Sequence, residues 1–263
     1  ANYFAFKVDD IEEAHSHINF QDLASDRAAY RLADQFDQDV LGYLSGYKQS
    51  ALHGTANAVN TTVNGSVAVS TAATNELLAS MQVDAADFNS GTSGNSIVAV
   101  PRASGDSLNT TTAKASPLSI IARMSRKLDQ QNVDTTGRWL VVDPVFAELL
   151  QDEDSRLLNS DYGGSGLQNG LILNNVHGFK VYMSNNLPAV GNGATGATST
   201  GSTHFGVIVG GHSSAVATAD SINKTETYRD PDSFADIVRG MHMYGRKILR
   251  PEALTRAIYV SGI

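Results

Sequence analysis

QDLASDRAAYRLADQFDQDVLGYL, residues 21–44, is the stretch that decides the fold. Its apolar side chains recur every four residues, at Ala28, Leu32, Phe36, Val40 and Leu44. That period places them in one stripe along an α-helix, with charged and amide side chains on the other faces. At 1.5 Å per residue the helix would be about 35 Å long, which exceeds the average globular helix. We therefore expect a long amphipathic helix with a sheet or a second helix packed along its stripe.

The composition indicates a globular protein and excludes several classes of function. The chain has 263 residues, enough for one large or two modest domains, and 41% of them are apolar. Charged residues make up 17%, and this low share suggests that much of the surface meets protein. With a net charge of −8 and no long Lys/Arg cluster, the chain has no nucleic-acid groove that grips by bulk charge. The absence of cysteine excludes disulfides and thiolate chemistry, and no apolar run approaches the roughly 18 residues of a membrane span.

The first 116 residues change character at the end of the long helix. Residues 1–8 alternate like a strand, which we interpret as half of a hairpin whose partner strand is missing. Residues 9–18 resemble a short capped helix, and Gly42 and Gly46 are expected to end the long one. The stretch 50–116 is rich in Ala, Ser, Thr, Asn and Gly; it contains a plausible helix at 74–87, a strand at 97–100 and strand-like alternation at 63–70. We expect ordered structure there, because the charge typical of disorder is missing.

The remainder predicts alternating helices and strands. Pro117 opens a helix to residue 133, with Leu118, Ile121, Met124 and Leu128 on its stripe. A strand follows at 138–142, and then a helix with Asp143 as its cap and Pro144 at its first position. We further predict strands at 171–173, 178–183 and 204–209, a short helix or turn at 213–220, and extended chain at 221–228. A long strand with interior glycines is expected at 235–249 and a short strand at 257–260, so the fold class is α+β.

The motifs with possible chemistry are weak. GNGATG at 191–196 matches G-x-G-x-x-G, but ATSTGST follows it and will not form the helix that a dinucleotide site needs. YGGSG at 162–166 and GTSG at 91–94 do not match a nucleophile elbow. His15 and His17 point to different helix faces, while His204 and His212 have no nearby matching carboxylate and are interpreted as structural. Nothing pairs a nucleophile with a base, so the sequence predicts no catalytic residue, no cofactor and no metal site.

Several segments taken in order resemble one family. They are RWLVVDPVFAELLQD at 138–152, LQNGLIL at 167–173, HGFKVYMSNNLP at 177–188, HFGVIVGGHSSAVATA at 204–219 and ETYRDPDSFADIVRGMHMYGRKILRPEAL at 226–254. Ahead of them, residues 1–8 lead through DDIEEAHSHINF into the long helix. The ordered set resembles the major capsid proteins of tailed bacteriophages, which have the Hong Kong 97-type fold. Residues 50–116 show no clear match.

The resemblance implies a division of the chain around a spine helix. It assigns residues 1–8 to the end of an extended loop, 9–49 to the peripheral domain with the spine helix, 50–116 to an inter-domain region or insertion, 117–234 to the axial domain of mixed sheet plus helices, and 235–263 to strands returning to the peripheral domain. Family members carry an N-terminal arm and a full extended loop before the point where this sequence starts. Because the sequence starts at Ala1 without an initiator Met, we expect that it was processed or begins inside a longer product. No covalent cross-link is carried over.

The resemblance also implies a function without catalysis. The chain would be the self-assembling shell subunit of an icosahedral capsid around double-stranded DNA, built of pentamers and hexamers, and assembled in the host cytoplasm into the virion. Expected partners are scaffold, portal and decoration proteins, and DNA held without sequence-specific binding; no membrane is expected. The density of charge in one strand-and-turn region makes a set of residues candidates for intersubunit contact: Arg229, Asp230, Arg239, Arg246, Lys247 and Arg250.

Two alternatives stay open at the level of sequence. An encapsulin-like nanocompartment shell shares the fold and would need cargo-binding features that the sequence does not display. A hydrolase or carbohydrate-binding protein would suit the Thr/Asn/Gly-rich middle, but no acid–base pair supports it, and the single tryptophan, Trp139, lies in an expected core strand.

Overall fold

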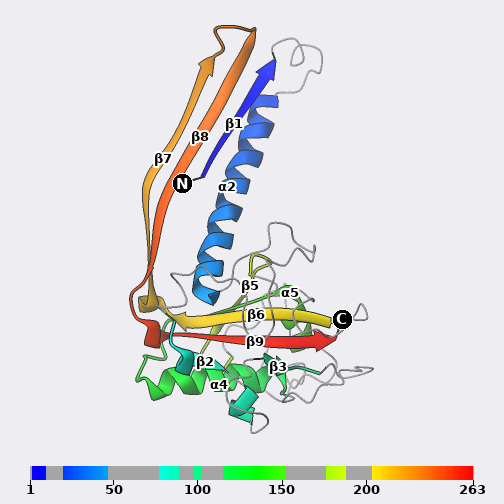
Figure 1. Ribbon diagram of the computed structural model, residues 1–263, viewed down its shortest axis with the longest axis vertical. Coiled ribbons are helices and arrows are strands. Elements are labelled where there is room, and N and C mark those ends of the chain that lie inside the picture. Colours follow the sequence, from blue (N-terminus) through cyan, green and yellow to red (C-terminus); the bar gives the residue numbers. More distant parts are fainter. Residues whose placement is uncertain are drawn as a thin grey trace. The chain divides into compact units, whose positions relative to one another are not determined.

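The computed structural model describes residues 2–9, 20–46, 77–83, 85–88, 97–101, 115–151, 176–187 and 203–262 (Figure 1). The chain forms two compact units. The first combines residues 1–37 with 216–247, and the second combines 38–215 with 248–263. Each unit is therefore built from stretches that are far apart in the sequence. The border between them falls within the long helix, which contributes residues to both units.

A three-stranded sheet in the order β1-β8-β7 forms the first unit. Its strands are β1 (Asn2–Asp9), β7 (Val216–Arg229) and β8 (Ala235–Ile248). β1 pairs antiparallel with β8 over its whole length, from Asn2 opposite His242 to Asp9 opposite Ala235. The prediction of a strand at 1–8 is confirmed, and its interpretation as half of a hairpin stays a prediction. The partner found for it, β8, lies more than 200 residues away in the chain, where local patterning cannot reveal it.

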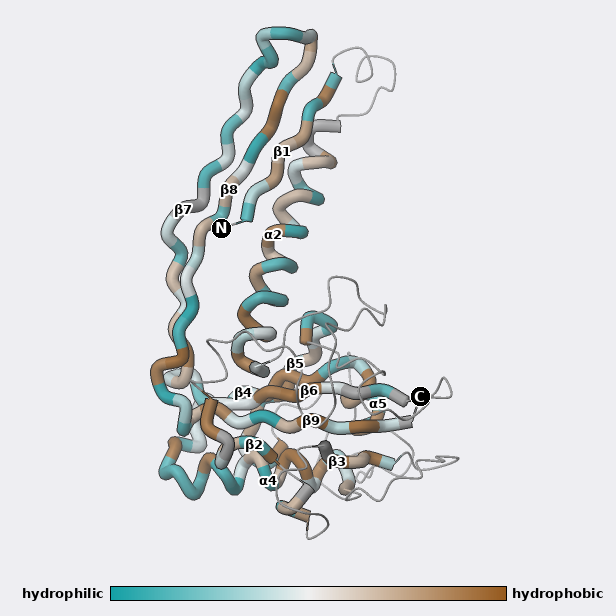
Figure 2. Tube along the Cα trace, viewed as in Figure 1, coloured by the Kyte–Doolittle hydropathy of each residue, from teal (hydrophilic) through white to brown (hydrophobic). Residues whose placement is uncertain are grey.

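Side chains alternate between the two faces of this sheet because the strand period is two. Figure 2 shows hydrophilic and hydrophobic residues interspersed along β1 and β8. Along β1 the even-numbered residues are half-buried and the odd-numbered ones exposed. Phe4 lies opposite Gly240, and a Cβ at 240 would lie 2.6 Å from the Phe4 ring. Gly240, an interior glycine of β8, therefore lies where a neighbouring side chain leaves no room for a Cβ. At Gly245 nothing lies within 4 Å of an added Cβ.

The predicted long helix is α2, Phe20–Ser45. Within the first unit, Phe36 on its apolar stripe meets the Tyr244 ring edge-on at 4.7 Å and His242 at 5.8 Å. Both partners are even-numbered residues of β8, so α2 packs on the half-buried face of the sheet. The amide of Asn2 donates a hydrogen bond to the Tyr244 hydroxyl on the same face, at 3.3 Å.

The C-terminus of α2 is held within the second unit. Gly46 follows the last helical residue with φ of +77°, a conformation that glycine adopts without strain. The guanidinium of Arg256 donates to the Ser45 carbonyl at 2.6 Å and to the Gln82 side-chain oxygen at 2.8 Å. A cation at this end also matches the negative pole of the helix. Gly42 was expected to help end the helix and does not; it lies inside the last turn.

A larger sheet dominates the second unit, with strand order β2-β9-β6-β4-β5 and β3 beside β9. β6 (Thr203–His212) and β9 (Leu254–Gly262) pair antiparallel at its centre, and β4 (Arg138–Val142) lies between β6 and β5 (Lys180–Met183). β2 (Gln82–Val83) and β3 (Ile97–Ala99) run parallel to β9. The central strands are nearly continuous apolar sequence because they are buried on both faces.

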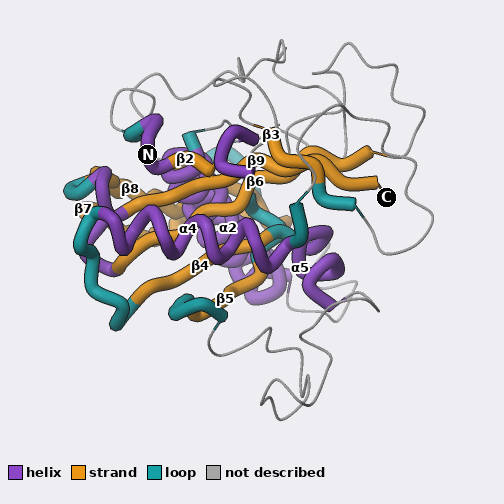
Figure 3. Tube along the Cα trace, turned by 90° about the horizontal axis from the view of Figure 1, so that it is seen from below, coloured by secondary structure: helices purple, strands orange, loops and turns teal. Residues whose placement is uncertain are grey.

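Helix α4 (Pro117–Gln130) lies along the strands of this sheet (Figure 3). Ser116 caps it, and Pro117 occupies its first turn as predicted. Its buried stripe is Ile120, Ile121, Met124 and Leu128, so Ile120 takes the core position expected of Leu118. The fully buried Arg138 stabilises the turn between α4 and β4. It donates to the Asp129 carboxylate at 2.7 Å and to main-chain carbonyls of residues 133 and 134.

One local prediction is wrong and two are confirmed in part. Residues 79–81 and 85–88 form short 3-10 turns on either side of β2, in place of a helix at 74–87. The helix or turn expected at 213–220 is confirmed only as a 3-10 turn at Ser213–Ala215, after which β7 begins. The strand expected at 178–183 is confirmed from Lys180, because Gly178 lies in a turn with φ of +87°. In the first two cases strand pairing with a distant segment overrides a weak local pattern.

The two sheets draw their strands from distant parts of the chain. β7 joins β8 in the first unit, and β9 joins β6 in the second. The expectations for residues 10–19, 63–70, 162–166, 171–173 and 191–202 lie outside the described residues.

Gly206→Ala should destabilise the second unit. Gly206 lies opposite Tyr259, and a Cβ there would lie 2.6 Å from ring atoms of that fully buried side chain. The hydrogen bond from the Tyr259 hydroxyl to Asp143 holds the buried ring in place, so the ring cannot move away from the added Cβ. We therefore expect a loss of about 1–3 kcal/mol in unfolding free energy. Chemical denaturation followed by circular dichroism measures it. The matched control, Gly245→Ala, should change stability by less than about 0.5 kcal/mol; equal losses from the two variants would contradict the packing argument.

Candidate assembly surface

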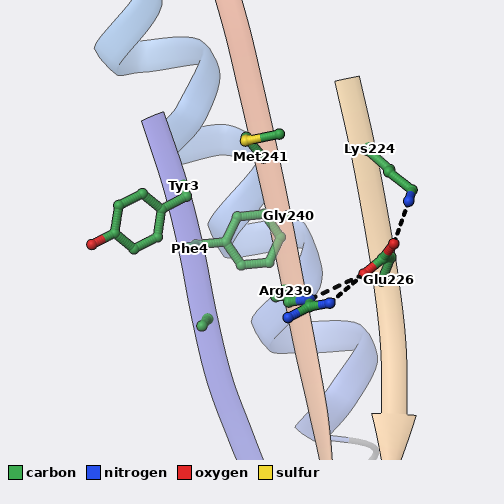
Figure 4. A pocket seen from close by; sticks show the side chains of 8 residues that line it. Tyr3, Phe4, Lys224, Glu226, Arg239, Gly240 and Met241 are labelled. Carbon is green, nitrogen blue, oxygen red and sulfur yellow. Dashed lines mark hydrogen bonds and ion pairs between the residues drawn. The ribbon is translucent and has the colours of Figure 1, made fainter. Parts of the chain in front are cut away.

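The face of the three-stranded sheet turned away from Phe36 carries a row of charges (Figure 4). Arg239 of β8 donates to Glu226 of β7 at 2.7 and 3.0 Å, and Lys224 forms an ion pair with the same carboxylate. The Arg239 guanidinium also lies 5.0 Å from the centre of the Tyr228 ring. A hollow of about 360 Å³ lies beside this row and is lined in part by Tyr3 and Met241.

The pKa values on this face show that its charged side chains are paired with one another within the chain. The Lys224 ammonium, and after it the Arg239 guanidinium, hold the pKa of Glu226 at about 2, below its ordinary 4.5. Glu226 in turn raises the pKa of Arg239. Candidate Arg239 therefore has a partner within its own chain, and a neighbouring subunit would have to compete for it or bind the pair as a unit.

The turn between β7 and β8 is organised by Asp230. Its carboxylate accepts hydrogen bonds from Lys7 at 2.6 Å, from the Ser233 hydroxyl at 2.7 Å and from the Asp232 amide at 3.2 Å. These donors hold the pKa of Asp230 at about 2, with Lys7 contributing most. Asp230 and Asp232 flank Pro231 in this turn, a pattern typical of turns, and the bond from Lys7 ties the turn to β1.

The structure does not gather the six candidate residues into one cluster. Arg229 lies 3.6 Å from Asp236 beside the turn, and Lys247 is exposed on the odd-numbered face of β8. Arg246 is on the opposite face, where partial burial lowers its pKa. Arg250 belongs to the second unit and pairs with Glu252 at 3.2 Å. These charged residues are close along the chain but not in space, because the side chains of consecutive strand residues point to opposite faces of the sheet.

Exposed apolar side chains were missed by the sequence analysis. Tyr3 is 81% exposed on β1 and Phe234 is 76% exposed at the β7–β8 turn, while Met241 and Met243 lie partly exposed on β8. The alternation of residues 1–8 already separates Tyr3 from Phe4 and was a usable signal. For Phe234 the sequence gives no comparable signal, since a Phe that follows a turn can equally be exposed or be the first core residue of the next strand.

A second omission lies in the core of the other unit. The interpretation that His204 has no nearby carboxylate is wrong: its Nε2 lies 2.7 Å from Asp143, which is 61 residues earlier. The Tyr259 hydroxyl donates to both oxygens of the same carboxylate at 2.7 Å, and the Phe146 amide donates at 3.4 Å as predicted for a helix cap. Burial, and then the negative charge of Asp143, raise the pKa of Tyr259. The cluster fixes the start of helix α5 (Pro144–Gln151) against β6 and β9.

Sites of other kinds can be assessed only over the described ranges. Within them, no group of three or more His, Cys, Asp or Glu side chains could hold a metal ion. No helix of those ranges is long and apolar enough to cross a membrane. The GNGATG segment lies outside them.

The fold is that of phage capsids. A solved structure from Mycobacterium phage Che8 is similar with a TM-score of 0.60 and 25% identity, over 98% of this chain and 69% of that one. The capsid structure of cyanophage P-SCSP1u has a TM-score of 0.57 and 19% identity, over 99% of this chain and 71% of that one. The mature capsid of bacteriophage PhiM1 has a TM-score of 0.57 and 15% identity, with coverage of 98% and 70%. The α+β arrangement is therefore the Hong Kong 97-type fold.

The sequence itself places the chain in a family. The family described as phage capsid protein matches residues 82–257, which is more than half of the chain. No curated protein matches the sequence. The chain belongs to the phage capsid protein family and is a shell subunit of a virus capsid, so its place is the virion. The predicted resemblance is confirmed.

Asp230→Asn should show how the turn depends on pH. A carboxyl with a lowered pKa adds stability that is fully present above its ordinary pKa of 3.8 and is lost as pH falls through about 2. The variant should therefore melt below the wild type at neutral pH, and the difference should shrink below pH 4 and vanish near pH 2. Thermal melting across that range measures this, with Asp232→Asn as a control that leaves the Lys7 pair in place. A deficit that stays constant down to pH 2 would count against the Lys7 pair.

Proposed function

We propose that the chain is the repeating subunit of an icosahedral shell, arranged as pentamers and hexamers around packaged double-stranded DNA. Family membership carries this proposal, because capsid proteins of this fold assemble from many copies. Closed shells of identical chains require contacts in which different surfaces of one subunit meet. The first unit offers such surfaces: α2 covers one face of its sheet, and the other face and the β7–β8 turn present charged and apolar side chains.

The charge of the chain fits a container more than a nucleic-acid binder. At −8, the subunit would not neutralise many phosphates, and tight phosphate binding would hinder packaging and release. We infer DNA contact without sequence-specific binding, and scaffold, portal and decoration proteins as further partners. We also infer a structural role without catalysis, since the strongest buried cluster, Asp143 with His204 and Tyr259, serves as a helix cap and sheet contact.

The two compact units are proposed as the domains of the subunit. The unit with the three-stranded sheet would be the peripheral domain and the unit with the larger sheet the axial domain, with α2 as the spine that belongs to both. In this assignment β1 is a sheet strand of the peripheral domain, in place of the end of an extended loop. The six candidate residues Arg229, Asp230, Arg239, Arg246, Lys247 and Arg250 are retained as proposed intersubunit contacts.

Particle formation is the direct test. Light scattering and negative-stain imaging of the purified chain should show particles of megadalton mass, and nuclease treatment of particles from an infected host should leave protected DNA. A chain that stays monomeric at high concentration would overturn the proposal. Particles that enclose protein cargo without DNA would identify an encapsulin-like compartment.

Arg246→Glu combined with Arg250→Glu should block particle formation while the subunit stays folded. The two introduced glutamates would face carboxylates of a neighbouring subunit, and like charges across an interface repel. Sedimentation measures the particulate fraction and circular dichroism the fold. Arg27→Glu, a reversal at an exposed arginine of α2 outside the candidate set, is the control. Normal particles from the double variant would remove Arg246 and Arg250 from the set.

A further inference from the structure

Phe234 is an apolar side chain held in solvent by a well-bonded turn. It is 76% exposed and directly precedes β8, whose first residue, Ala235, is buried. The turn beneath it is fastened by Asp230, which bonds Lys7, Ser233 and the amide of Asp232. The Asp230 amide also donates to the Ala235 carbonyl at 2.9 Å. A large apolar side chain on a rigid support loses little entropy on binding, which is the property of an interface anchor.

The same unit contains an open cleft that suits such an anchor. The cleft lies between β1 and α2 and has a volume of about 360 Å³. Phe4, Ala28 and Leu32 supply its apolar surface, and Asn2 and Gln35 supply amides. This volume is at the lower end of the range for binding pockets and accommodates one aromatic side chain.

Charge at the cleft is complementary to the turn. Arg31 is the one charged residue among those that line the cleft. It lies 3.3 Å from Asp34, but its side chain is 78% exposed, and a guanidinium has five N–H donors and can bind a second carboxylate. The turn carries the exposed Asp232, whose carboxylate would approach Arg31 if Phe234 entered the cleft.

The turn of a subunit cannot fill that subunit's own cleft. Phe4, in the cleft, pairs with Gly240, and Phe234 lies six residues earlier along the same strand. At 3.3–3.4 Å per residue the separation is about 20 Å, which a rigid hairpin cannot close. An occupant with this chemistry must therefore come from another molecule.

We propose that the β7–β8 turn of one subunit docks in the β1–α2 cleft of a second copy, with Phe234 as the anchor and Arg31 facing the carboxylate of Asp232. The contact is heterologous: each copy presents one turn and one cleft, so the contact repeats from copy to copy as a shell requires. The inference rests on the proposed assembly of many copies and specifies two of the surfaces that meet.

The first experiment compares assembly of matched variants. Phe234→Ser should lower the particulate fraction in sedimentation at least about tenfold, as loss of an aromatic anchor does, while Phe234→Leu keeps most of it. Filling the cleft with Ala28→Trp should act like Phe234→Ser. Ala29→Trp, an equal change at the next residue, which is exposed and does not line the cleft, should assemble normally. Circular dichroism of unassembled chains checks that each variant is folded.

The second experiment uses the absence of cysteine in the chain, so that any disulfide comes from the introduced pair. Particles of Phe234→Cys with Gln35→Cys should form intermolecular disulfides on mild oxidation. Phe234→Cys with Tyr30→Cys should not, because Tyr30 is exposed on the same helix but does not line the cleft. Disulfides in Phe234→Cys alone would show that turns meet one another and would overturn the proposal.

The outcomes separate this inference from the proposed function. If the wild type forms no particles, the proposed assembly fails. If the wild type forms particles and Phe234→Ser and Ala28→Trp form them equally well, the assembly stands and only the docking of the turn is overturned.

Discussion

The pairing of β1 with β8 is the interaction on which the first unit depends. Eight residues from the beginning of the chain pair with residues 235–242 near its end, so the intervening chain must be closed into one loop before the sheet exists. A two-stranded hairpin alone is marginally stable in water. The third strand and the packing of Phe36 on Tyr244 and His242 supply the burial that makes the sheet stable. The Lys7–Asp230 pair then locks the far end of the same strand to the β7–β8 turn.

The second unit is stabilised in a different way. Its central strands are buried on both faces, and two of its buried polar side chains, Arg138 and Asp143, each make several hydrogen bonds. Arg138 bonds the turn after α4, and Asp143 collects His204, Tyr259 and the amide of Phe146. Removing one member of such a cluster leaves a buried polar group without its partner, which costs more than the bond contributes. This unit contains most of the buried apolar side chains among the described residues, whereas the first unit exposes Tyr3 and Phe234.

The buried core of the second unit and the open surfaces of the first explain how one chain can be stably folded and also form a repeating subunit of a shell. The spine helix α2 belongs to both units, and its end is fixed in the second by Arg256 and Gly46. The first unit keeps one face of its sheet, its turn and the β1–α2 cleft open. Surfaces of this kind are poorly explained for an isolated subunit but are expected where copies of a chain complete one another.

The sequence by itself determined the elements whose causes are local. The four-residue stripe of α2, the Ser116 and Pro117 start of α4, the Asp143 cap of α5 and the alternation of β1 and β8 were all readable, because periodicity and capping act within a few residues. The ordered set of motifs was also enough to indicate the capsid fold. Only the tertiary structure decided which strands pair, which is why the helix expected at 74–87 gave way to β2 beside β9. The same non-local contacts brought Asp143 to His204 and left Phe234 in solvent, since a side chain's neighbours depend on chain closure over tens to hundreds of residues, and no short window of sequence contains them.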